Sequence, residues 1–298
     1  MKKKIYLYLC GGLGNQLFQY AAAKNLAIKN NADLILDTKS GFVTDFRDYW
    51  EFSLSKLNIN NVVLKKNIPM FWLYRILKKI FNLKFIFNNL LLGTLINEML
   101  INFFHKDINN YKIVKNLYLF GYFQSEKYFI ENKKTILDEL RPSPPNNELF
   151  LDMKKKIIEC NSISLGIRLH ESMPKNITHK VGGITSMDFY KQAFSLIIKK
   201  IINPVFFIFS TKLSNVENFL SNFNEINKYK FYIITEDKGF SGAVDNLWLM
   251  SHCANHIISN STLYWWAAYL STTKYSNQKI ICADNFYNKD TCLDSWKL

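Results

Sequence analysis

A polar turn between two apolar segments is the strongest chemical feature of this sequence. In the stretch DNLWLMSHCANHIISNSTLYWWAAYL (245–270), a short strand-like run at 256–259 ends in Asn260, Ser261 and Thr262, and a buried helix is predicted to follow. Hydroxyls and backbone N–H groups then lie at the positive end of a helix dipole, where a phosphate binds well. An ordinary N-cap remains the alternative for the same residues.

A glycine-rich turn near the N-terminus is the second such feature. A predicted strand at 4–9 is followed by CGGLGNQ and then by a helical pattern, with a spacing that is neither the dinucleotide fingerprint nor a Walker loop. The glycines allow close approach of the backbone to a ligand, and the two amides suit a hydroxyl-rich ligand. A tight turn that needs glycine for packing is the alternative. The residues predicted to line a ligand cleft are Gly11, Gly12, Gly14, Asn15 and Gln16.

Strands alternate with helices along the chain, which predicts an α/β fold with parallel sheets covered on both faces. In the second half, strands are predicted at 163–168, 205–209, 231–234, 256–259 and 279–283. Ligands bind beyond the carboxyl ends of such strands, so the polar residues there are candidate site residues. They are Arg168 to Glu171, Ser210 and Thr211, Thr235 to Asp237, and Ser259 to Thr262.

The chain has 298 residues, enough for two core-bearing domains of about 140 residues each. The segment RPSPPNN at 141–147 contains three prolines, which end a helix and stiffen a connection. The predicted domains are therefore 1–145 and 146–298.

The net charge of +14 is compatible with nucleic acid, an anionic membrane surface or an anionic small substrate as partner. The lysines are spread over many segments, which disfavours a nucleic-acid stripe. The five cysteines are widely spaced and lack metal-ligand spacing, so reduced thiols in a cytoplasmic protein are expected and zinc is not. The apolar run after MKKK is too short for an export signal.

The stretch 64–104 is apolar but interrupted by Asn and Lys, which disfavours a membrane-spanning helix. Core helices with one solvated face are expected there. The alternative is an amphipathic segment on the inner face of the cytoplasmic membrane. Its basic residues facing the lipid would be Arg75, Lys78, Lys79 and Lys84.

Three segments, GGLGNQLFQYA (11–21), GYFQSEKYF (121–129) and the stretch 245–270, resemble the signature segments of the bacterial α-1,2-fucosyltransferase family in sequence and order. The resemblance implies a GT-B architecture, in which two Rossmann-like domains face a central cleft. The N-terminal domain would take the acceptor and the C-terminal domain the GDP-sugar. It also implies an inverting transfer of L-fucose from GDP-L-fucose, without a metal or other cofactor.

The implied acceptor is the 2-hydroxyl of a galactosyl residue in a lipid-linked oligosaccharide of a surface polysaccharide such as O-antigen. One motif departs from the family. The family usually has His-x-Arg-Arg-Gly-Asp-Tyr after the first strand of the donor domain, whereas this chain has GIRLHES at 166–172. Gly166 replaces the histidine and Glu171 stands at the aspartate position. A pocket altered in this way leaves room for a related GDP-sugar that lacks a hydroxyl, such as GDP-colitose.

The resemblance assigns roles to individual residues. Arg168 would pair with the donor β-phosphate and stabilise the charge that develops on departing GDP. Asp245 would accept hydrogen bonds from guanine N1–H and the exocyclic amine, with a helix N-cap as the structural alternative. The predicted donor-binding residues are Asp245, Asn260, Ser261, Thr262 and Ser210.

An inverting transfer also needs a group that takes the acceptor proton, and the available side chains are Glu171, His170 and His179. The predicted catalytic residues are Arg168, Glu171 and His170. A competing hypothesis from another class is a basic protein that kept this fold, lost catalysis and binds nucleic acid or a membrane surface.

Overall fold

The computed structural model describes residues 2–43, 50–73, 86–90, 93–169 and 182–298. The chain divides into two compact units, Met1–Arg141 and Pro142–Leu298. The division falls at the start of the proline-rich segment, slightly before the boundary expected after residue 145.

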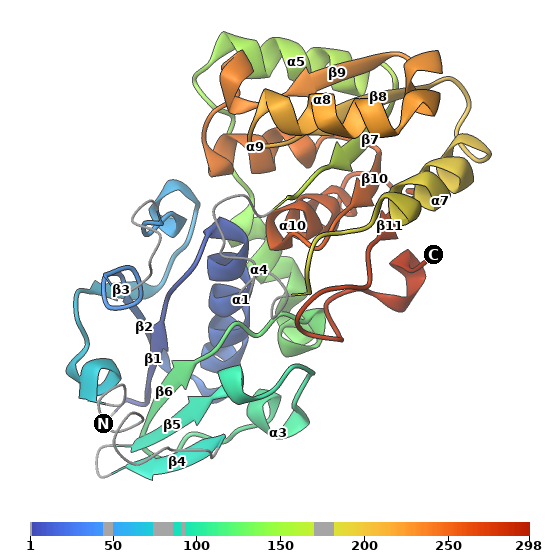
Figure 1. Ribbon diagram of the computed structural model, residues 1–298. Coiled ribbons are helices and arrows are strands. Elements are labelled where there is room, and N and C mark those ends of the chain that lie inside the picture. The colour runs from blue at the N-terminus through green and yellow to red at the C-terminus, as the bar shows by residue number, and fades with distance from the viewer. Residues whose placement is uncertain (1, 44–49, 74–85, 91–92, 170–181) are drawn as a thin grey trace. The chain divides into compact units, whose positions relative to one another are not determined.

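Unit 1 contains a six-stranded sheet with the order β3-β2-β1-β6-β5-β4 (Figure 1). Its pairs are parallel except β4 with β5, which is antiparallel. Its strands are β1 (Lys4–Tyr8), β2 (Asp33–Asp37), β3 (Val62–Lys65), β4 (Phe87–Leu90), β5 (Gly93–Asn97) and β6 (Asn116–Phe120).

Unit 1 contains helices α1 (Leu13–Asn30), α3 (Lys106–Asn109) and α4 (Lys133–Leu140), and residues 69–73 are also helical. Helix α1 packs on β1 and β2, and α4 packs on α1. The residues of β1 alternate between the two faces of the sheet. Tyr8 therefore lies on the opposite face from Leu7, in an aromatic cluster with Phe71 and Phe120.

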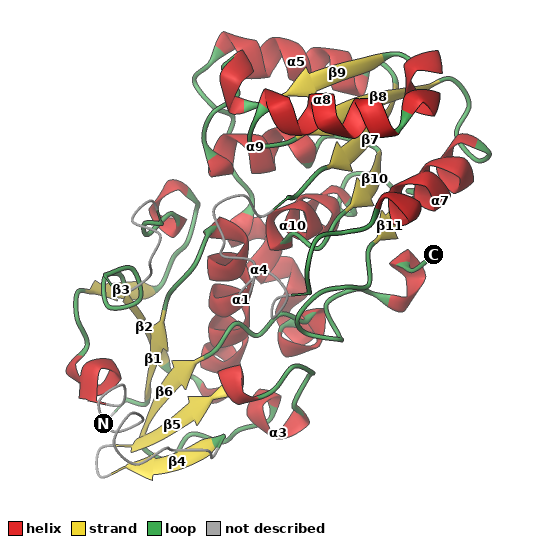
Figure 2. Ribbon diagram, in the orientation of Figure 1, coloured by secondary structure: helices red, strands yellow, loops and turns green. Residues whose placement is uncertain are grey.

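Unit 2 contains a five-stranded, wholly parallel sheet with the order β11-β10-β7-β8-β9 (Figure 2). Its strands are β7 (Asn161–Gly166), β8 (Pro204–Phe209), β9 (Phe231–Ile234), β10 (Asn255–Ile258) and β11 (Ile280–Cys282). Its helices are α5 (Glu148–Ile158), α7 (Met187–Ile198), α8 (Leu213–Asn222), α9 (Ala243–Met250) and α10 (Thr262–Ser271).

The chain of unit 2 runs from β7 outwards through β8 to β9, then returns to the other side of β7 as β10 and β11. Right-handed crossovers place the helices before and after this reversal on opposite faces. Aromatic side chains of α7 and α8, including Phe194 and Phe219, cover one face. On the other face, α9 packs against α10 and α5, and α10 packs against β10.

The prediction of core helices with one solvated face in 64–104 is confirmed at residues 69–73, which are helical with Phe71 buried and Trp72 exposed. It is corrected at 87–97, where strands β4 and β5 form and the antiparallel pair closes the edge of the sheet. The basic residues proposed to face lipid, Arg75 to Lys84, lie outside the described residues. In the part of the chain that is described, helices long and apolar enough to cross a bilayer do not occur. All five cysteines are free thiols.

Candidate functional site

The strand order of unit 2 creates a topological switch point between β7 and β10. The register pairs Gly166 with Ile258, so the two neighbouring strands end together. Arg168 follows the first of these ends, and Ser259 to Thr262 follow the second. Ligands of open parallel sheets bind outside the strand ends at such a point. The structure therefore brings the predicted phosphate-binding residues to one edge of one sheet.

Helix α10 begins at this switch point with Thr262 as its first residue and Ser261 as its N-cap. Among the described residues, the Ser261 side chain makes no capping hydrogen bond to this helix, and its first turn contains no acidic residue. Ser261 is half-buried and its own N–H donates to the carbonyl of Ser259 at 2.7 Å. A helix start that lacks a side-chain cap from its N-cap residue, and has no acidic residue in its own first turn, is suited to an anion. The N-cap alternative is thus disfavoured for the Ser261 hydroxyl.

Two tyrosine hydroxyls hold the backbone at the end of β7. The Tyr190 hydroxyl donates to the carbonyl of Gly166 at 3.0 Å. The Tyr264 hydroxyl lies 3.0 Å from the carbonyl oxygen of Ile167 and 3.1 Å from that of Phe209. These carbonyls belong to the residues just before Arg168 and Ser210. The tyrosines therefore fix the backbone from which both predicted donor-site residues project.

Gly166 stands where the resembled family has histidine, and its surroundings explain the exchange. A Cβ at this position would lie 2.3 Å from Cδ2 and 2.6 Å from Cε2 of the Tyr264 ring. The ring is 8 % exposed and occupies the space that a side chain at 166 would need. The Tyr264 ring thus leaves no room for an imidazole at position 166.

Asp245 lies in the first turn of α9, whereas the N-cap of that helix is Gly242. The N-cap alternative for Asp245 is therefore corrected. Gly242 has a φ of 94°, which glycine adopts without strain. Helix α9 follows β9 along the chain, so its N-terminus lies at the carboxyl edge of the sheet. Asp245 is half-buried, and the helix dipole favours a carboxylate at this position.

Asn260 and Ser210 have protein partners. The Asn260 side-chain amide is buried and donates to the carbonyls of Gly183 at 2.7 Å and Asn285 at 3.3 Å. It therefore ties the loop after β11 to the segment before α7. The Ser210 hydroxyl accepts from Nδ2 of Asn215 at 3.3 Å. The predicted base candidates His170, Glu171 and His179 lie outside the described residues.

Unit 1 has its own switch point, between β1 and β6. Two of the three signature segments meet there, because Nε2 of Gln124 donates to Oδ1 of Asn15 at 2.9 Å. Gly11 has a φ of 78°, and a Cβ on it would lie 2.8 Å from Nδ2 of Asn15. Gly12 is the N-cap of α1, and Gly14 is buried in its first turn.

Gln16 does not have the role that its sequence position predicts. Its side chain is fully buried, and Nε2 donates to the carbonyls of Gly11 at 2.9 Å and Glu51 at 2.8 Å. Its Oε1 accepts from the backbone N–H of Ser53 at 3.0 Å. Both donor hydrogens of the amide are used within the protein. Gln16 therefore fastens the segment around Glu51 to the glycine turn.

Glu98 is a buried carboxyl at the same edge of unit 1 and was not identified from the sequence. It follows β5 in the 3₁₀ turn Glu98–Leu100, and its side chain is 2 % exposed. Its Oε2 accepts from the backbone N–H of Tyr122 at 2.8 Å. Burial raises the pKa of Glu98 to about 8, although hydrogen bonds from the backbone of Phe123 and Tyr122 oppose the shift.

The contribution of Glu98 to the stability of the fold is expected to decrease as the pH rises from about 5 to 9. Because the pKa of Glu98 is raised from 4.5 to about 8 on folding, the native state binds the proton more tightly, and its advantage is lost above pH 8. The loss in unfolding free energy is on the order of 4 kcal/mol. Urea unfolding at intervals across this range measures it. In Glu98→Gln that pH dependence should be absent, and an identical dependence in the variant contradicts the assignment to Glu98.

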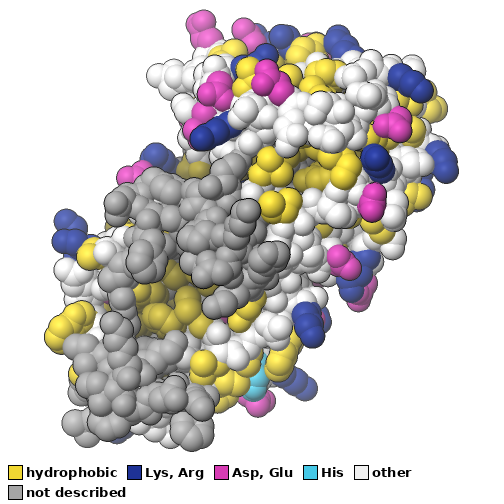
Figure 3. Space-filling model, in the orientation of Figure 1, with side chains coloured by type: hydrophobic (Ala, Val, Ile, Leu, Met, Phe, Trp, Pro, Cys, Tyr) yellow, Lys and Arg dark blue, Asp and Glu magenta, His cyan; other side chains and the backbone are white. Residues whose placement is uncertain are grey.

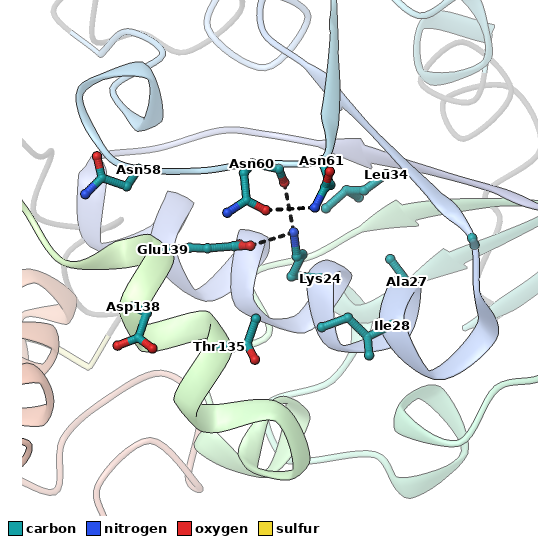
Figure 4. Close-up of a pocket in the computed structure, with 11 residues that line it drawn as sticks. Lys24, Ala27, Ile28, Leu34, Asn58, Asn60, Asn61, Thr135, Asp138 and Glu139 are labelled. Carbon is teal, nitrogen blue, oxygen red and sulfur yellow. Dashed lines mark hydrogen bonds and ion pairs between the residues drawn. The ribbon is translucent and has the colours of Figure 1, made fainter.

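A pocket of about 460 Å³ lies at the other edge of unit 1, beside the loop that precedes β3 (Figure 4). In it, Nζ of Lys24 lies 2.8 Å from Oε1 of Glu139, and both side chains are less than a tenth exposed. The Tyr20 hydroxyl donates to Oε2 of Glu139 at 2.5 Å, and burial raises the pKa of Tyr20. Lys24 also donates to the carbonyl of Asn60 at 2.8 Å. This buried network joins α1, α4 and the loop.

Known proteins with similar sequences and structures identify the family. The model of "Glycosyl transferase family 11" matches residues 4–297. An Escherichia coli α-1,2-colitosyltransferase is 30% identical over 88% of this chain and 86% of that protein. The Escherichia coli O-antigen biosynthesis glycosyltransferase WbnK is 30% identical over 98% of this chain and 99% of its own length.

The fold has a solved counterpart in the fucosyltransferase NodZ from Bradyrhizobium. The TM-score is 0.52 with 11% sequence identity, over 91% of this chain and 93% of NodZ. The two doubly wound units described above are the Rossmann-like domains of a GT-B glycosyltransferase, as the sequence predicts. From the match along nearly its whole length, together with the two relatives, the chain belongs to glycosyltransferase family 11.

Proposed function

We propose that this glycosyltransferase transfers a 6-deoxy sugar from a GDP-sugar to a hydroxyl of an O-antigen-type oligosaccharide. The observation that carries the proposal is the switch point of unit 2, where Arg168 and the uncapped start of α10 follow adjacent strand ends. The names of the two Escherichia coli relatives support both the donor class and the polysaccharide.

The donor diphosphate is assigned to this switch point. The N–H groups of the first turn of α10, with the hydroxyls of Ser261 and Thr262, would donate hydrogen bonds to the pyrophosphate oxygens. The guanidinium of Arg168 would neutralise the charge on the leaving GDP. Asp245 would bind the guanine edge. In the proposal, Asn260 shapes this site through its loop contacts rather than by bonding the ligand.

The proposed reaction is a single displacement. The acceptor oxygen forms a bond to the anomeric carbon as the bond to the β-phosphate oxygen of GDP breaks, and the configuration inverts. The acceptor proton passes to a general base, and Glu171 and His170 remain the proposed candidates for it. Arg168 and the α10 dipole would supply the positive potential that the leaving diphosphate requires, so no metal is assigned a role.

The acceptor is assigned to unit 1, where Asn15 and the glycine turn lie at the switch point. The proposed acceptor group is the 2-hydroxyl of a galactosyl residue, carried on a lipid-linked oligosaccharide at the inner face of the cytoplasmic membrane. On the face that Figure 3 shows, Lys and Arg side chains are dispersed among Asp and Glu. That face has no continuous basic stripe among its described residues, which supports a small anionic substrate over a nucleic acid.

The identity of the sugar is the finer part of the proposal. L-Fucose is the first candidate, from the resemblance in sequence. The exchange of histidine for Gly166 favours the second candidate, colitose. The Tyr264 ring leaves no room for a side chain at 166, and its hydroxyl lies against the carbonyls of Ile167 and Phe209, so a sugar hydroxyl would lose the imidazole as a partner there. A site without that partner does not discriminate against a sugar without the hydroxyl.

The test compares GDP-L-fucose and GDP-colitose with one galactose-terminated acceptor. We expect transfer from both, with kcat/KM for GDP-colitose at least equal to that for GDP-L-fucose. Thermal stabilisation by GDP, with UDP and ADP as controls, measures nucleotide selectivity without an acceptor. A higher kcat/KM for GDP-L-fucose than for GDP-colitose would exclude the colitose assignment. Transfer from neither donor, without GDP-selective stabilisation, would refute the function itself.

A further inference from the structure

The loop after β6, residues 121–124, contains a backbone conformation that is unfavourable for its amino acids. Phe123 has a φ of 52°, in the left-handed region that is unfavourable for a residue with a Cβ. Its side chain is fully buried and packs edge-on against Tyr128, with 5.5 Å between ring centroids. The left-handed conformation of Phe123 costs about 1 kcal/mol or more, so contacts with neighbouring residues must stabilise it.

The group that holds it is the carboxyl of Glu98. Strands β5 and β6 are neighbours with Asn97 paired to Phe120, so Glu98 emerges directly opposite the start of the loop. Its carboxyl accepts hydrogen bonds from the backbone N–H groups of Tyr122 and Phe123. A Cβ on Gly121 would lie 2.6 Å from both Cβ and Oε2 of Glu98. The contact therefore requires glycine at 121 and an acceptor atom at 98.

The loop ends at Gln124, which is the residue that bonds Asn15 across the switch point of unit 1. Gln124 is buried and Asn15 is half-buried. The path from Glu98 to the proposed acceptor site thus has two contacts: carboxyl to loop backbone, and Gln124 to Asn15. Glu98 itself is too buried to reach a substrate.

We propose that Glu98 is a positioning residue for the acceptor: it fixes the 121–124 loop so that Gln124 holds Asn15 in its binding orientation. The inference rests on the proposed function, in which unit 1 takes the acceptor. The role requires a hydrogen-bond acceptor at position 98 and no proton transfer. This requirement separates it from a role as general base.

The test uses Glu98→Ala and the conservative Glu98→Gln, with Gln124→Ala as the matched variant further along the path. Glu98→Ala should raise KM for the acceptor by about tenfold, the effect of one or two lost hydrogen bonds, with kcat and KM for the donor nearly unchanged. Glu98→Gln retains an acceptor oxygen and should restore most of the affinity. The double variant Glu98→Ala/Gln124→Ala should be no worse than the more impaired single variant, because both changes break one path.

Amide hydrogen exchange of Tyr122 and Phe123 provides a readout that needs no substrate. Both amides should be protected in the wild type and in Glu98→Gln, and should exchange faster in Glu98→Ala. If Glu98→Ala does not fold, Glu98→Asn replaces it in each experiment. Its side chain is one methylene shorter, so the acceptor oxygen lies farther from the loop. Equal impairment of Glu98→Gln and Glu98→Ala, or additive effects in the double variant, would overturn the proposal.

These readouts also separate failure of this inference from failure of the proposed function. If the wild type transfers from neither GDP-sugar and is not selectively stabilised by GDP, the function is wrong, and the acceptor role for Glu98 is wrong with it. If the wild type is active, but Glu98→Ala changes KM for the donor instead of the acceptor, the function stands and only the role of Glu98 is refuted.

Discussion

Arg168→Ala is expected to lower kcat by a factor of about 100 to 1000, the usual effect of removing one preorganised group that stabilises transition-state charge. Arg168 follows the end of β7 at the switch point, and the adjacent strand end of β10 leads into α10. Charge on the leaving diphosphate grows as the glycosidic bond breaks, so the loss should appear in kcat more than in KM for the acceptor. Initial rates with saturating acceptor and varied GDP-sugar measure it.

Arg168→Lys is the matched control, because it keeps the charge but loses the bidentate geometry. It should retain part of the activity. The thermal midpoint should be nearly unchanged in both variants, since Arg168 follows the strand and is half-buried. Wild-type kcat in Arg168→Ala, with undiminished stabilisation by GDP, would show that the diphosphate binds elsewhere.

Lys24→Met is expected to destabilise unit 1 by about 3–5 kcal/mol, because it leaves a buried carboxylate without its partner. Glu139 is 4 % exposed and would keep only the hydrogen bond from Tyr20. The double variant Lys24→Met/Glu139→Leu should recover much of this loss, since no uncompensated charge remains. Urea unfolding at pH 7 measures both.

The exposed pair between Lys155 and Asp152 supplies a control within the same chain. Its atoms are 2.9 Å apart, close to the 2.8 Å of the buried pair, but both side chains are more than half exposed. Lys155→Met should change stability little, because solvent screens the interaction. A loss as large as that of Lys24→Met would mean that burial is not the cause.

Much of unit 2 is predictable from the sequence because hydrophobic alternation and strand-end chemistry are local signals. The polar residues after β7, β8 and β10 lie at one edge of the sheet as predicted. The roles of Tyr190 and Tyr264 are not predictable in this way. Aromatic residues at helical spacing indicate core packing, and nothing local shows which carbonyl their hydroxyls reach.

Prediction from local sequence patterns has the same limit in unit 1. The glycine turn and the Gln124 segment are recognisable, but their contact spans more than a hundred residues. Gln16 resembles a ligand-binding amide in sequence, whereas its partners are backbone groups of Gly11, Glu51 and Ser53. Glu98 lies in an apolar stretch where one acidic residue has no distinguishing pattern. Its importance comes from burial, which depends on the assembled sheet.

The close fit between Gly166 and the Tyr264 ring constrains how this sequence can change. A Cβ at 166 and a ring at 264 occupy the same space, so a histidine at 166 of this chain requires a smaller or differently placed side chain at 264. The two positions are 98 residues apart in sequence yet must be exchanged together. Attempts to graft the common motif onto this chain must therefore change both positions at once.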